Sequence, residues 1–441
     1  MTICKHVLNR AAGLLTVAII VLASTFANAV EIQTVTSDKG VKALLVEDYT
    51  VPLIALQFSF KGGATQDAEG KEGTAQLLTT LLDEGAGDMD SETIQAKLDD
   101  VGLSYSFNAG RDGFSGGMKT LVSEKDEAFS TFALMLNEPR FDADPVKRMK
   151  NAALSRLKRN KQNPQALAGK ALRESVFGSH PYGRSSRGTI ESVESLGADD
   201  VRDYHRRVFA RDNLVVGVVG AISKDELKTV LDAIFGDLPE KAALSPVPDI
   251  APKTGDNVHV DLGVPQTTIA LSLPGIKRDD PDFFTAYLVN YVLGGGSFSS
   301  RLYTEIREKR GLAYGAYSYL GTYDSSATIG AGTATSAERA NQTVDILFAE
   351  IKRMAEEGPT EEELEKAKKY IIGSYAVQNL DTSDKIASVL VAIQEADLGL
   401  DYIDRRASLI EKVTIEDAKR VARELFSGKA TLVTVGAPLK K

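Results

Sequence analysis

The hydrophobic residues of this chain follow two periods, one typical of strands and one typical of helices. Strand-like runs fall within residues 41–61, and residues 104–121 alternate apolar and polar positions among glycines and aromatics, as antiparallel strands do. Residues 73–83 have apolar positions at helical spacing, and residues 144–176 form a long, basic helical stretch that Pro164 interrupts. These patterns predict a sheet of several strands with helices on one face, which is an α+β layer architecture.

The same order of elements occurs twice along the chain. The strand-like sequence that begins at Val51 has a counterpart beginning at Val264, and the helical stretch that ends at Phe209 has one ending at Phe426. The offset between the two copies is 213 to 217 residues throughout. The helices expected in the second copy cover residues 281–293, 301–309, 338–356 and 360–376. The repeat therefore predicts two homologous domains, each built from a sheet and helices.

Composition sets the boundaries between these parts. Four prolines between residues 239 and 256 are typical of a linker. The predicted segments are a signal peptide over 1–29, a first domain over 30–238, the linker over 239–256 and a second domain over 257–441.

The N-terminal segment is typical of a secretory signal. Lys5 and Arg10 precede an apolar run over residues 11–23, and an Ala-Asn-Ala cleavage pattern ends at Ala29. An uncleaved anchor is the alternative, although the run is short for a membrane span. The only cysteine, Cys4, lies within this segment, so the mature chain has no thiol. We expect a periplasmic protein that is free of the membrane after cleavage.

Charge argues against one class of partner. The whole chain has a net charge of −9, and removal of Lys5 and Arg10 with the signal makes it −11. Nucleic acid is therefore not an expected partner, because binding to its phosphate backbone requires a basic surface.

Residues 73–82, GTAQLLTTLL, resemble the zinc-binding helix of the pitrilysin, insulinase and mitochondrial processing peptidase family, which reads G-L-A-H-L-L-E-H-M-L. The resemblance extends along nearly all of the mature chain, and it implies half of a pitrilysin-type clamshell. In register, Gln76 and Thr80 replace the two histidine ligands and Thr79 replaces the glutamate base. Arg156 stands at the position of the third ligand, a glutamate. All four residues that hold and use zinc in the family are therefore replaced.

A substitute metal site is not expected elsewhere. The mature chain has three histidines, His180, His205 and His259, and none lies within helical reach of another. His180 begins the sequence HPYG, which active relatives also contain, and we interpret it as a turn residue. We therefore predict no cofactor in this chain and no peptide hydrolysis by the chain alone.

Another part of the resemblance lies in the second half. Arg307 and Tyr314 keep the seven-residue spacing of a family pair that faces the zinc site, where it binds the substrate carbonyl and stabilises the oxyanion. The alternative is a solvated arginine and an ordinary sheet tyrosine. Gly294, Gly295 and Gly296 resemble the substrate-contacting glycine-rich loop of the non-catalytic processing-peptidase subunit. Their alternative role is a helix-ending loop that needs positive φ.

This pattern of loss and retention suggests a divided enzyme. The leading hypothesis is a non-catalytic subunit of a heterodimeric periplasmic zinc endopeptidase, whose homologous partner carries the zinc. Peptide substrates would bind in extended form along an exposed sheet edge. The alternatives are a structural scaffold, or a peptide-binding module or chaperone that works alone. An active peptidase conflicts with the residues at positions 76, 79, 80 and 156.

Overall fold

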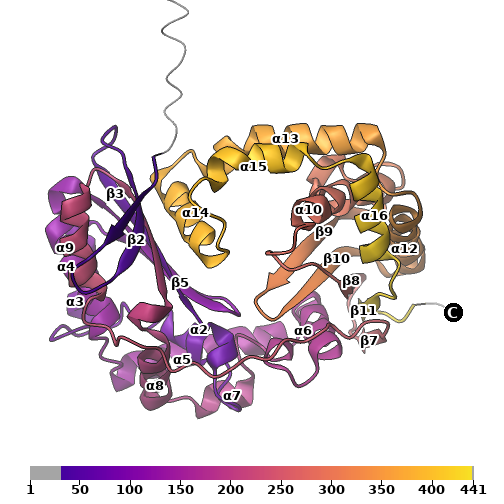
Figure 1. Cartoon of the computed structure of the whole chain (residues 1–441). Coiled ribbons are helices and arrows are strands. Elements are labelled where there is room, and N and C mark those ends of the chain that lie inside the picture. The colour runs from indigo at the N-terminus through magenta and orange to yellow at the C-terminus, as the bar shows by residue number, and fades with distance from the viewer. Residues whose placement is uncertain (1–30, 440–441) are drawn as a thin grey trace, which may run out of the picture.

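The computed structural model describes residues 31–439, so the predicted signal peptide lies outside the described residues. Two sheets with their helices stand on either side of a central opening (Figure 1). Among the described residues, no helix is both long and apolar enough to cross a membrane.

The first sheet has six strands in the order β1-β2-β6-β3-β5-β4. Parallel pairing joins β2 to β6, and the other neighbours are antiparallel. The strands are β1 (Gln33–Thr36), β2 (Lys42–Glu47), β3 (Leu53–Lys61), β4 (Ser104–Ala109), β5 (Gly113–Leu121) and β6 (Leu214–Gly220).

The second sheet has the order β7-β11-β8-β10-β9, which is the order of the first sheet without its outermost strand β1. Parallel pairing joins β7 to β11, as it joins β2 to β6. The two copies predicted from the sequence therefore fold into the same topology. The strands are β7 (Asn257–Asp261), β8 (Gln266–Pro274), β9 (Ala313–Tyr323), β10 (Ser326–Ser336) and β11 (Thr431–Gly436).

Helices cover the outer face of each sheet and bury its main core. Interlocked phenylalanines fill the first core, where the rings of Phe60 and Phe209 stack at 4.5 Å. The helices of the first half are α2 (Thr74–Leu78), α3 (Ser91–Val101), α4 (Lys125–Asn137), α5 (Ala143–Asn160), α7 (Ile190–Ser195), α8 (Ala198–Val208) and α9 (Lys224–Phe235). Those of the second half are α10 (Phe283–Asn290), α11 (Arg301–Tyr303), α12 (Ala340–Glu357), α13 (Glu361–Asn379), α15 (Tyr402–Glu411) and α16 (Ile415–Phe426).

The inner face of each sheet is covered by a helix from the other half, so the prediction of helices on one face was wrong. Helix α6 (Pro164–Phe177) belongs to the first half, but its Ala168 packs against Val433 and Val435 of the second sheet. Helix α14 (Ser383–Glu395) packs in return on β2, β3 and β6 of the first sheet (Figure 1). Gly217 on β6 makes the second contact possible, because a Cβ there would lie 2.8 Å from Cβ of Leu390.

Residues 239–256, predicted to be the linker, form neither helix nor strand. Their backbone is nevertheless held by both halves, since Lys253 N–H donates to the Val176 carbonyl (2.9 Å) and Ile250 N–H donates to the Ser325 carbonyl (2.9 Å). The linker is therefore bound to both halves along its length by backbone hydrogen bonds.

Candidate functional site

The helix that carries the vacated zinc motif is shorter than predicted. Helix α2 ends at Leu78, whereas the sequence pattern indicated a helix over residues 73–83. The hydroxyls of Thr79 and Thr80 donate to the carbonyls of Gln76 and Leu77 (2.8 Å each), and the chain continues in turns. Such side-chain bonds to nearby carbonyls compete with helical geometry.

A buried carboxylate holds the start of this helix. Asp67 accepts the backbone N–H groups of Gly73 (2.8 Å) and Ala75 (2.9 Å). Burial raises the pKa of Asp67 to about 7, although the two N–H groups act in the opposite direction. No sequence signal indicated this residue, because its partners are backbone groups.

The structure brings three of the four motif positions together. Gln76 and Thr80 line a cavity of about 80 Å³ with Arg156, and Arg187 adds a second guanidinium. Thr79 lies outside the lining, where its hydroxyl accepts a hydrogen bond from the Gln76 amide (3.1 Å). A cavity that presents an amide, a hydroxyl and two cations does not fit a zinc ion, which needs about three neutral or anionic ligands. No group of three or more His, Cys, Asp or Glu side chains among residues 31–439 is arranged to hold a metal ion.

The three histidines among residues 31–439 have structural partners in separate places. His180 Nδ1 accepts the Tyr182 N–H (3.1 Å) and Nε2 donates to the Pro248 carbonyl (2.9 Å), so its predicted place in a turn is confirmed. His205 Nε2 donates to the Leu136 carbonyl (2.8 Å), and burial lowers the pKa of this ring to about 4. His259 Nδ1 lies 3.0 Å from the Thr434 hydroxyl.

Arg307 and Tyr314 lie against each other. The Arg307 guanidinium carbon is 4.6 Å from the centre of the Tyr314 ring and 4.9 Å from that of Tyr303, whose hydroxyl accepts one of its N–H groups. Tyr314 is the second residue of the edge strand β9 and is 87% exposed. The cation is therefore fixed between two rings, and the phenol of Tyr314 faces solvent.

A buried ion pair anchors the helical segment that leads to Arg307. Arg301 is 6% exposed, and it donates to both carboxylate oxygens of Glu363 (2.7 and 2.6 Å) and to the Gly358 carbonyl (2.9 Å). Glu363 also accepts the N–H of Thr360 (2.8 Å) in the capping box of α13. The segment with Arg307 is thereby tied to the start of α13.

The three glycines are explained by close contacts and not by left-handed backbone. Gly294, Gly295 and Gly296 are absent from the glycines with positive φ, whereas Ser297 beside them has φ +47°. The positive-φ alternative for the glycines was therefore wrong. A Cβ on Gly294 would collide with the Ser318 backbone nitrogen and lie 2.9 Å from a methyl of Leu302. These glycines end a π-helical turn that runs tightly against β9.

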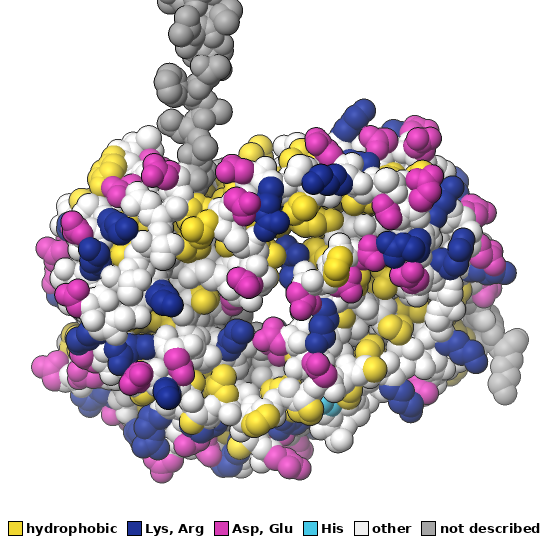
Figure 2. Space-filling view, viewed as in Figure 1, with side chains coloured by type: hydrophobic (Ala, Val, Ile, Leu, Met, Phe, Trp, Pro, Cys, Tyr) yellow, Lys and Arg dark blue, Asp and Glu magenta, His cyan; other side chains and the backbone are white. Residues whose placement is uncertain are grey.

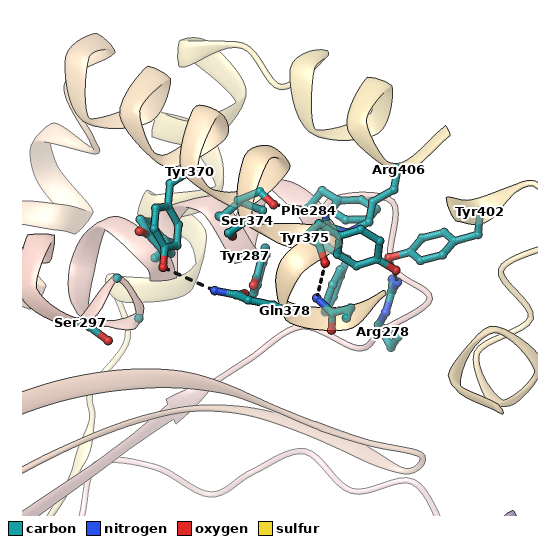
Figure 3. A pocket seen from close by; sticks show the side chains of 16 residues that line it. Arg278, Phe284, Tyr287, Ser297, Tyr370, Ser374, Tyr375, Gln378, Tyr402 and Arg406 are labelled. Atoms are coloured by element: carbon teal, nitrogen blue, oxygen red, sulfur yellow. Dashed lines mark hydrogen bonds between the residues drawn. The ribbon is translucent and has the colours of Figure 1, made fainter. Parts of the chain in front are cut away.

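Gly295 and Gly296 border a pocket of about 380 Å³ that the sequence did not reveal. Figure 3 shows side chains from α13, α15 and α10 converging on it. Its lining combines seven aromatic rings with Arg278 and Arg406 and contains no carboxylate. These residues are spread over more than 120 positions of the chain, so no local motif marks them.

The space between the two halves is hollow, as the space-filling view shows (Figure 2). A cavity of about 630 Å³ there is lined by Gln57 and Ser59 of β3, by Tyr323 at the end of β9 and by Ser388 of α14. The strands β4 and β9 are edges of their sheets, and β9 exposes Tyr314, Tyr317 and Tyr319. An extended peptide would find unpaired backbone groups along either edge.

Comparison with known proteins supports the assignment that the motifs suggested. Residues 42–190 match the family described as Insulinase (Peptidase family M16), and residues 195–371 match the Peptidase M16 inactive domain. A Helicobacter pylori protein named non-peptidase homolog YmxG is 25% identical over 349 residues, which are 78% of this chain and 80% of that protein. A Bacillus subtilis protein named uncharacterized zinc protease YmxG is 26% identical over 404 residues, 91% of this chain and 97% of the relative.

Solved structures agree. A crystal structure of a peptidase M16 inactive domain from Pseudomonas fluorescens is 28% identical, with a TM-score of 0.88, and the match covers 93% of this chain and 99% of that one. A protease from Helicobacter pylori has the same fold at 19% identity, with a TM-score of 0.82 and coverage of 93% and 100%. The two-domain arrangement is therefore shared with solved structures.

Proposed function

Because this chain belongs to peptidase family M16, we propose that it is the non-catalytic subunit of a heterodimeric periplasmic zinc endopeptidase. The chain itself is a pseudopeptidase, since none of the residues at its motif positions can ligate zinc or serve as general base. Zinc would belong to a homologous partner subunit, and the predicted signal peptide would direct the chain to the periplasm.

The pairing of Arg307 with Tyr314 carries the proposal. The guanidinium is oriented by two rings, and Tyr314 is 87% exposed, so its phenol O–H is accessible to a ligand. A fixed cation and a free O–H donor suit a peptide carbonyl whose oxygen gains negative charge during hydrolysis. The pair would complete the partner's active site, with the glycines at 294–296 contacting the same peptide.

The test is a turnover assay with the purified chain, a zinc-bearing M16 subunit from the same organism and a quenched fluorescent peptide. We expect Arg307→Ala and Tyr314→Phe each to lower kcat/KM by about 100-fold, as the loss of one oxyanion donor does. Tyr314→Phe keeps the ring over the guanidinium, so it isolates the hydroxyl.

Matched controls come from the same surface. Arg310→Ala removes an exposed arginine that pairs with Glu305, and Tyr317→Phe removes a hydroxyl from another exposed tyrosine of β9. Both variants should retain full turnover. Equal turnover in all four variants and the wild type would reject a shared active site and leave a scaffold or a peptide-binding pseudopeptidase.

A further inference from the structure

The pocket between α10, α13 and α15 contains a buried cation without an anion. Arg406 on α15 is 8% exposed, and its guanidinium carbon lies 4.0 Å from the centre of the Tyr375 ring. Its one hydrogen bond to the rest of the described chain is long, from NH1 to the Ile371 carbonyl at 3.4 Å. Within residues 31–439 no carboxylate lies within ion-pair distance of it.

A second arginine shares this pocket. Arg278 lies over the Phe283 ring at 4.1 Å and donates to the Tyr402 hydroxyl at 3.2 Å, and no acidic partner accompanies it in the described part of the chain. Figure 3 shows Arg278 and Arg406 approaching the Tyr375 and Tyr402 rings from different elements. Burial is the main cause that raises the pKa of Tyr375, whereas the charges of Arg406 and Arg278 act to lower it.

Arg301 provides the comparison within the same domain. It is as deeply buried as Arg406, but both oxygens of Glu363 receive its N–H groups. A buried cation is strongly destabilising unless an anion pairs with it. In a chain with more acidic than basic residues, an unpaired pair of guanidiniums in an aromatic pocket indicates a site whose anion arrives with a ligand.

We propose that this pocket binds a peptide carboxylate between Arg278 and Arg406, with an apolar or aromatic side chain against the tyrosine rings. The carboxylate can be a C-terminus or an Asp or Glu side chain, because a guanidinium binds both in the same bidentate way. The volume of about 380 Å³ suits one or two amino-acid residues.

The neighbouring glycines favour a peptide over a phosphorylated ligand. Gly295 ends a π-helical turn, and a helical C-terminus presents carbonyl oxygens with partial negative charge. Partial negative charge at this end of the pocket disfavours a doubly charged phosphate more than a singly charged carboxylate. This inference depends on the proposed function in one respect, because that function supplies a peptide as the ligand of the pocket that the glycines border.

Calorimetric titration of the full mature chain tests the proposal with four probes. These are the peptide Ala-Ala-Ala-Phe as free acid, the same peptide as C-terminal amide, the amide Ala-Ala-Glu-Phe, and phenyl phosphate. We expect the free acid, the glutamyl amide or both to bind at least about tenfold more tightly than the neutral amide. The stronger of the two identifies the source of the carboxylate. Equal binding of all three peptides, or tighter binding of phenyl phosphate, would overturn the proposal.

Variants connect the binding to the two arginines. Arg406→Gln and Arg278→Gln should each weaken binding of the preferred peptide by about tenfold or more. Arg405→Gln is the matched control, because Arg405 is the exposed neighbour on α15 and pairs with Asp401. If this control weakens binding as much as Arg406→Gln does, the pocket is not the site.

Thermal melting separates a binding role from a structural one. Removal of an unpaired buried cation should leave the Tm of Arg406→Gln unchanged or raised, whereas a purely structural arginine would lower it. Arg278 is less buried, so its variant tests the binding even if Arg406→Gln fails to fold. If the wild type shows no preference for a carboxylate but Arg307→Ala and Tyr314→Phe still lower turnover, the pocket proposal is refuted and the proposed function is not.

Discussion

Replacement of Glu363 by Gln should destabilise the second domain, because it breaks a buried ion pair while keeping the shape of the side chain. The carboxylate receives two N–H groups of Arg301 (2.7 and 2.6 Å), and the arginine is 6% exposed. Gln is also accepted at this position of a capping box, so the start of α13 should remain. The change therefore removes charge pairing and little else.

The size of the effect follows from the ionisation of Glu363. Burial raises its pKa, but the hydrogen bonds from Arg301 and from the Thr360 N–H outweigh burial and lower the pKa from 4.5 to about 2. By linkage this difference is about 3 kcal/mol. Because the Glu363 side chain is 30% exposed, solvent screening reduces the expected loss to about 2 kcal/mol.

Urea denaturation followed by circular dichroism measures this loss. At pH 7 the free energy of unfolding of Glu363→Gln should lie about 2 kcal/mol below that of the wild type. A depressed carboxyl pKa stabilises the fold above pH 4.5, and the contribution disappears as the pH falls through about 2, so the two proteins should converge in acid. Glu362→Gln is the control, since Glu362 is exposed and pairs with the exposed Lys366. Equal stability of both variants at pH 7 would refute the reasoning.

Further predictions concern other parts of the fold. The buried ring of His205 is neutral in the folded protein, so it does not reduce the stability of the fold above its ordinary pKa of 6.5. As the pH falls from 6.5 towards 4, the unfolded chain binds a proton that the folded protein does not, and the fold loses stability. Between pH 7 and pH 5 the free energy of unfolding of the wild type should therefore fall by about 2 kcal/mol more than that of His205→Gln. Urea denaturation at both pH values measures this difference. Gly294→Ala should cost about 1–3 kcal/mol through overpacking against β9, whereas Gly315→Ala, whose added Cβ meets no atom within 4 Å, should not lower the Tm in the same melting assay. Zinc added to the purified chain and then dialysed should remain substoichiometric by elemental analysis, and stoichiometric retention would contradict the absence of a metal site.

Features set by local pattern were predictable from the sequence. The strands over residues 41–61 and 104–121 and the helix break at Pro164 were correct, because alternation, glycine and proline act within a few residues. Three positions of the degenerate motif that lie far apart in the sequence, Gln76, Thr80 and Arg156, line one cavity in the structure. The early end of helix α2 is a local feature that the hydrophobic pattern missed, because residues 79–82 keep helical spacing while the hydroxyls of Thr79 and Thr80 bind nearby carbonyls and the chain continues in turns.

Features set by distant contacts were not predictable. The covering of the inner face of the second sheet depends on the packing of Ala168 against Val433, residues that lie 265 positions apart, and α14 covers the first sheet through contacts that are likewise distant in the sequence. The pairing of Arg278 with Arg406 around one pocket has the same origin.

Each half buries its main core with its own helices, but the crossing of α6 and α14 means that neither half covers the inner face of its own sheet. Without α14, the side chains of Leu44, Val46 and Val219 would be exposed to water, and without α6 the same would happen to Val433 and Val435. This reciprocal exchange of helices resembles the exchange in a domain-swapped dimer, here within one polypeptide. A single half produced on its own should therefore form dimers. A protease cut between residues 239 and 256 should leave the two fragments associated.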